Sequence, residues 1–167
     1  MLGSSAGALI GLMFVVVTLT TGRDRRQLER GKQLYTSPVV WQLGVVLFLS
    51  GVAIVPSINL RLFGATSGGL ALLGVGMGLR SAIGISRTPI AGAENNLFDT
   101  CWYGIAPALT YVALGAAAWL LFAGSQWAPH AIAADLMALL LISIHAEWDL
   151  VTYLAPIAGQ PPPDGRA

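Results

Sequence analysis

The stretch Ser143-Ile-His-Ala-Glu-Trp-Asp-Leu-Val-Thr-Tyr153 places three ionisable side chains inside an apolar segment that extends over residues 132–155. A segment of this length crosses a bilayer as a helix, and each ionised side chain near its middle costs about 2.5–3.5 kcal/mol. His145, Glu147 and Asp149 therefore need polar partners. The stretch predicts a transmembrane helix that carries a polar centre.

The composition of the whole chain is that of a membrane protein. Of its 167 residues, 55% are hydrophobic and 10% are charged, whereas about 25% of the residues of a soluble domain are charged. A net charge of +1 gives no support for a nucleic-acid partner. The single cysteine, Cys101, cannot form a disulfide within the chain, and we interpret it as a small packing residue.

Five windows are long and apolar enough to cross a membrane, and they cover about residues 2–21, 38–57, 63–85, 100–123 and 132–155. They predict an all-α fold, a polytopic membrane helix bundle of five transmembrane helices in one domain over residues 1–158. The proline-rich tail, residues 159–167, is expected to be disordered.

The third and fourth windows are less regular than the others. The third contains seven glycines, and if it only dips into the membrane the bundle has four spans. Asp99 or Thr100 is expected to cap the fourth helix, and Pro107 to bend it.

The basic residues predict the orientation of the bundle. With five spans and the N-terminus outside, eight of the nine Lys and Arg residues lie on the inner face, and Arg61 alone lies outside. Short cytoplasmic loops carry such an excess, so we predict an N-out, C-in protein of a bacterial inner membrane. The first inner loop is expected to contact anionic lipid headgroups or a soluble partner through Arg23, Arg25, Arg26, Arg30 and Lys32.

Glycines recur every four residues in the first and third windows. Such strips let a neighbouring helix approach closely, and we interpret them as packing surfaces within the bundle. The alternative is an interface in a homo-oligomer or a larger membrane complex. The glycines are Gly3, Gly7 and Gly11, then Gly64 with Gly68 and Gly74 with Gly78.

His145 and Asp149 are one turn apart on one face of the last helix, where an imidazole and a carboxylate can interact. Asp135 and Thr152 continue this face. Glu147 shares the opposite face with Ser143. Because polar groups on two faces need protein on both sides, we expect this helix to be central in the bundle.

Arg80 is the predicted cationic partner of this helix. It lies 17 residues into the third window, as Asp149 lies 17 residues into the fifth, so both are about 25 Å from the outer edge. A guanidinium suits a forked pair with a carboxylate. The buried polar cluster that the sequence predicts therefore consists of His145, Glu147, Asp149, Arg80, Asp135 and Thr152.

These patterns favour a non-enzymatic structural, accessory or regulatory subunit whose buried charges fix the bundle. The alternative is a small transporter or a proton- or ion-conducting protein that uses His145 and Asp149. A metal site would need a further ligand from Glu94, Asp99 or Cys101, and a membrane enzyme would need a nucleophile in a recognisable setting. We predict no catalytic residue, no metal and no cofactor.

Overall fold

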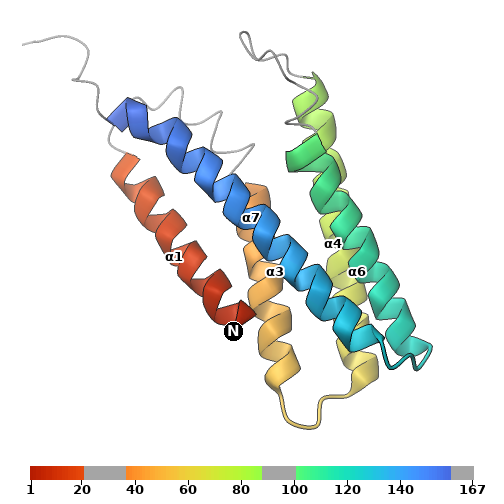
Figure 1. The fold of residues 1–167 in the computed structure, drawn as a ribbon. Coiled ribbons are helices and arrows are strands. Elements are labelled where there is room, and N and C mark those ends of the chain that lie inside the picture. Colours follow the sequence, from red (N-terminus) through yellow and green to blue (C-terminus); the bar gives the residue numbers. More distant parts are fainter. Residues whose placement is uncertain (21–36, 88–100, 159–167) are drawn as a thin grey trace, which may run out of the picture.

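The computed structural model describes residues 1–20, 37–87 and 101–158. Within these residues the fold consists of helices, with no strand (Figure 1). The all-α prediction is confirmed for this part of the chain. The α-helices are α1 (Leu2–Thr20), α3 (Ser37–Ile54), α4 (Leu60–Arg87), α6 (Ala106–Phe122) and α7 (Ala128–Ala158), and a π-helical turn, η2 (Cys101–Ile105), precedes α6.

Three helical segments of the described chain are long and apolar enough to cross a membrane. They are Leu60–Ser81, Cys101–Phe122 and Ala128–Asp149. The apolar segments Leu2–Val15 and Pro38–Ile54 are shorter. By length and composition, the structure therefore supports three of the five predicted spans.

Successive helices run in opposite directions (Figure 1). The N-terminus, the α3–α4 connection and the α6–α7 connection lie at one end of the bundle. The start of α3, the last turns of α4 and α7, and η2 lie at the other, which we call the η2 end. α4 and α7 therefore run in the same direction.

The helix boundaries differ from the predicted windows at three places. α4 begins at Leu60 and remains helical through all its glycines, and α7 begins at Ala128 rather than at residue 132. Pro107 lies in the first turn of α6, and the backbone irregularity is the π-helical turn before it. Asp99, Thr100 and the 159–167 tail lie outside the described residues. Cys101 is exposed, so its interpretation as a packing residue was wrong.

The glycines of α4 pack against α6. A Cβ atom at Gly74 would overlap the ring of Tyr111, and one at Gly78 would lie 3.0 Å from Ala108 Cβ. Small residues therefore bring the two helices close together within one chain. Gly3 of α1 has a similar position, because its Cβ would lie 3.0 Å from Ser50 Cβ of α3.

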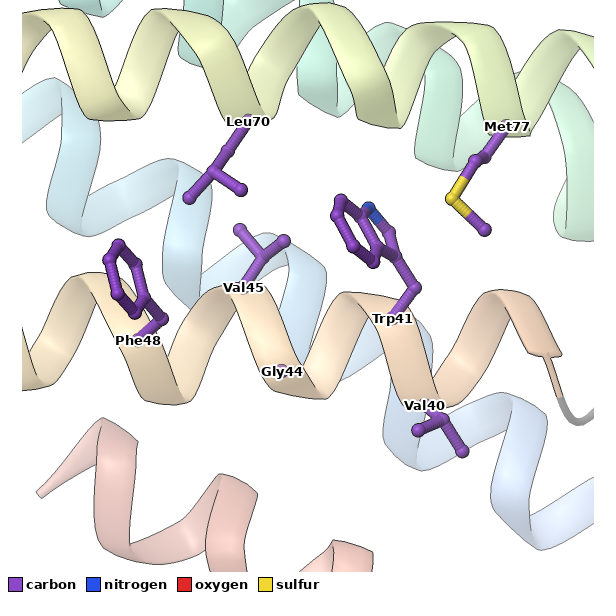
Figure 2. A pocket seen from close by; sticks show the side chains of 7 residues that line it. All are labelled: Val40, Trp41, Gly44, Val45, Phe48, Leu70 and Met77. Atoms are coloured by element: carbon purple, nitrogen blue, oxygen red, sulfur yellow. The ribbon is translucent and has the colours of Figure 1, made fainter.

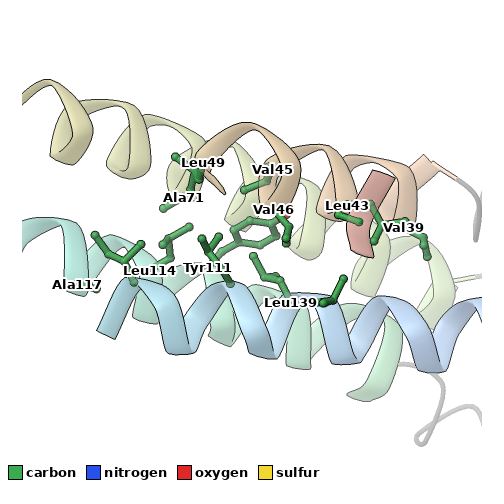
Figure 3. Close-up of a cluster of buried hydrophobic side chains, with 14 of the residues drawn as sticks. Val39, Leu43, Val45, Val46, Leu49, Ala71, Tyr111, Leu114, Ala117 and Leu139 are labelled. Carbon is green, nitrogen blue, oxygen red and sulfur yellow. The ribbon is translucent and has the colours of Figure 1, made fainter. Parts of the chain in front are cut away.

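The apolar core lies where α3, α6 and α7 meet (Figure 3). Leu43, Val46 and Leu49 of α3, Tyr111 and Leu114 of α6, and Leu139 of α7 are buried there. The outer faces are also apolar: Leu72 is 77% exposed, Trp119 73% and Phe14 70%. Large exposed apolar side chains on several helices are typical of a surface that contacts lipid.

Candidate functional site

The candidate site is a polar cluster at the η2 end, between α7 and η2. The Tyr103 hydroxyl of η2 donates a hydrogen bond of 2.5 Å to Asp149 Oδ2 of α7. His145 Nε2 lies 3.5 Å from the same oxygen, which is long for a hydrogen bond. The hydrogen bond from Tyr103 is therefore the closer of the two contacts that Asp149 Oδ2 makes. The side chains of His145 and Asp149 are 42% and 43% exposed, so the pair lies at the edge of the bundle.

The π-helical turn supplies both aromatic residues of this cluster. Trp102 packs edge-on against His145, with ring centroids 4.7 Å apart and an interplanar angle of 70°, which is a favourable geometry for aromatic rings. Ser81 of α4 donates to the carbonyl oxygen of Tyr103 at 3.4 Å. The cluster therefore connects α7, η2 and α4. π-helical turns are frequently found at functional sites.

A second polar group lies on the opposite face of α7, toward α3. Ser143 Oγ is 3.0 Å from Gln42 Oε1 of α3 and 2.9 Å from Leu139 O, and both polar side chains are buried. A hydroxyl has one proton and donates to one oxygen at a time. Glu147 is one turn further along and 7% exposed, and its Oε1 has no hydrogen-bond partner among the described residues.

The structure brings together only part of the predicted cluster. His145 and Asp149 interact, whereas Glu147 lies on the other face of α7. Asp135 precedes Asp149 by 14 residues, which is about 21 Å along the helix axis. Thr152 is exposed and donates to backbone oxygens of its own helix, on Trp148 and Asp149.

Arg80 does not join this cluster. It is exposed, and the basic side chain that the structure places against the Asp149 carboxylate within the described residues is His145, at 3.5 Å. The reason is the rotation of α4 about its axis. Gly74 and Gly78 face α6, and Arg80 lies about 200° around the helix from Gly78, so it points away from that contact. Equal depth along two helices does not bring two side chains together.

The other candidate contact residues lie outside the described residues or do not gather into a site. The basic residues of the first loop, Arg23, Arg25, Arg26, Arg30 and Lys32, and the possible metal ligands Glu94 and Asp99 fall in ranges 21–36 and 88–100, which the structure does not describe. In the part that it describes, no three His, Cys, Asp or Glu side chains gather in one place.

The sequence prediction missed Trp102, Tyr103 and Gln42. Tyr103 lies in the first turn of the fourth window, which a helix running toward the α6–α7 connection places at the depth of Asp149, but depth alone does not select a partner. Gln42 is a lone amide in the apolar second window, and buried polar groups generally need partners. This amide in an apolar window indicated a buried polar contact, which the structure shows to be with Ser143.

The arrangement suits hydrogen bonding and proton exchange between a carboxylate, an imidazole and a phenol. The chain matches no protein-family model, no curated protein and no solved structure. The role of the site is therefore inferred from its geometry.

Proposed function

We propose that the protein is a multi-pass membrane protein of a bacterial inner membrane, with five spans, that acts as a non-enzymatic structural, accessory or regulatory subunit. The polar groups of α7 fix the bundle. The observation that carries this proposal is the hydrogen bond from Tyr103 to Asp149, because it joins α7 to a turn 46 residues away in sequence. A hydrogen bond to a charged group contributes about 1.5–3 kcal/mol.

A double-mutant cycle tests whether this bond holds the helices together. Tyr103→Phe, Asp149→Asn and the double variant are purified in detergent, and their free energies of unfolding are compared. Because the two groups share one interaction, we expect the double variant to lose about 1–3 kcal/mol less than the sum of the single losses. Thr152→Val is the control, since Thr152 bonds only to its own helix. Additive losses would contradict the proposed lock.

The proposed subunit has two further contact surfaces. Arg23, Arg25, Arg26, Arg30 and Lys32 would contact anionic headgroups or a soluble partner at the inner face. The part of α1 around Gly11 would contact a second copy or a larger complex, because a Cβ at Gly11 would meet nothing within 4 Å, whereas Gly3 already packs against Ser50 of α3.

A small proton- or ion-conducting protein is the second candidate function. It is favoured by the exposure of His145 and Asp149, which makes the pair reachable from outside the bundle. The test is pH-driven flux across proteoliposomes that contain wild type or His145→Gln. We expect no specific flux from either protein. A wild-type current that His145→Gln abolishes, with thermal melting unchanged, would support conduction instead.

A further inference from the structure

An apolar groove lies between α3 and α4 (Figure 2). Its volume is about 440 Å³, within the range of small-molecule sites. Val40 and Phe48 on its wall are 41% and 52% exposed, so the groove opens to the outside of the bundle. All its lining residues are apolar or aromatic: Val40, Trp41, Gly44, Val45, Phe48, Leu70 and Met77.

One wall of the groove carries a buried hydrogen-bond donor. Trp41 Nε1 is buried and has no hydrogen-bond partner among the described residues. In Figure 2 the indole lies between the two helices with its nitrogen turned toward α4. An indole N–H can only donate, and leaving a buried donor unpaired costs about 1–3 kcal/mol. Because Nε1 is buried, it is closed to an occupant of the groove, and the fit of an occupant rests on the apolar walls.

A cation lies just beyond one end of the groove. Arg80 follows Met77 by three residues on α4, which is about 4.5 Å toward the η2 end. It is exposed, and no ion pair of the described chain involves it. A guanidinium is well suited to a phosphate.

We propose that the groove binds one acyl chain of an anionic glycerophospholipid. The acyl chain lies along Leu70 and Phe48, and Arg80 contacts the phosphate. Leu70 is 10 residues into the span Leu60–Ser81 and Arg80 is 20 residues into it, or about 15 and 30 Å. These depths match the middle of a bilayer and its boundary. The site is independent of the proposed scaffold function.

Headgroup selectivity tests the role of Arg80. The full-length protein in detergent is titrated with phosphatidylglycerol or phosphatidylcholine of identical chains, and bound lipid is measured by native mass spectrometry. We expect about fivefold tighter retention of phosphatidylglycerol, since one basic residue contributes about 1 kcal/mol near anionic lipid. Arg80→Gln should abolish this preference. Arg61→Gln, an exposed arginine at the other end of α4, should keep it. An equal loss in both variants, or no preference in wild type, would overturn the proposal.

Variants that fill the groove test whether the acyl chain binds there. A Cβ at Gly44 or at Gly51 of α3 meets nothing within 4 Å, but only Gly44 lines the groove. Gly44→Leu should lose retention of both lipids severalfold, and Gly51→Leu should retain them, with melting temperatures used to confirm that both fold. If Gly44→Leu changes only the oligomeric state, a second copy fills the groove and the lipid assignment is wrong.

Discussion

Two tyrosines of this fold differ in what their hydroxyl groups contact. The Tyr103 hydroxyl is bonded to Asp149. Tyr111 is 2% exposed, and its hydroxyl has no hydrogen-bond partner among the described residues. Burying a polar group without a hydrogen-bond partner lowers the stability of the fold, because the group loses its contacts with water. Replacing it with an apolar group of the same shape removes this cost.

We therefore expect opposite effects from one chemical change. Tyr103→Phe should lower the free energy of unfolding by about 1.5–3 kcal/mol, since it deletes a bond to a carboxylate. Tyr111→Phe should leave it unchanged or raise it by up to about 1 kcal/mol. Denaturant unfolding in detergent micelles, followed by circular dichroism, measures both. A similar loss in the two variants would mean that the Tyr111 hydroxyl has a partner outside the described ranges.

At the scale of the helices, the apolar windows predicted the elements well because the length and hydropathy of a helix are properties of its own sequence. The rotation of each helix is set by its neighbours, and there the prediction failed. Arg80 and Asp149 were matched by depth, but the glycine face of α4 packs on α6 and turns Arg80 outward. Its glycine spacing contained this information. The π-helical placement of Tyr103 had no such local signal.

The glycine face of α4 gives a prediction with a control in the same helix. Gly74→Ala would place a methyl group in the ring of Tyr111, whereas a Cβ at Gly76 meets nothing within 4 Å. Overpacking of this kind costs about 1–3 kcal/mol, so Gly74→Ala should lower the thermal midpoint and Gly76→Ala should not. Equal midpoints for the two variants would show that α4 and α6 are not packed in this way.

At the scale of the whole molecule, α7 contacts helices from two parts of the bundle. It contacts α1, α3 and α6. One polar face of α7 is hydrogen-bonded to Gln42 of α3, and the other is hydrogen-bonded to Tyr103 of η2. The expectation that the last helix is central agrees with this arrangement. The sequence of α7 alone did not predict the partner of each polar residue, because these partners come from segments that are distant in sequence.

The alternating directions of the helices (Figure 1) lead to a prediction about topology. If all five helices cross the membrane, the two ends of the chain lie on opposite sides, and the distribution of basic residues predicts that the C-terminus is inside. A reporter fused after Ala167 should therefore be cytoplasmic.

In a Cys101→Ser background, which removes the one native thiol, Gln126→Cys should react with an impermeant maleimide in intact cells, because Gln126 is exposed in the α6–α7 connection. Arg26→Cys should react only after permeabilisation. A periplasmic reporter would contradict the arrangement of five spans with the N-terminus outside.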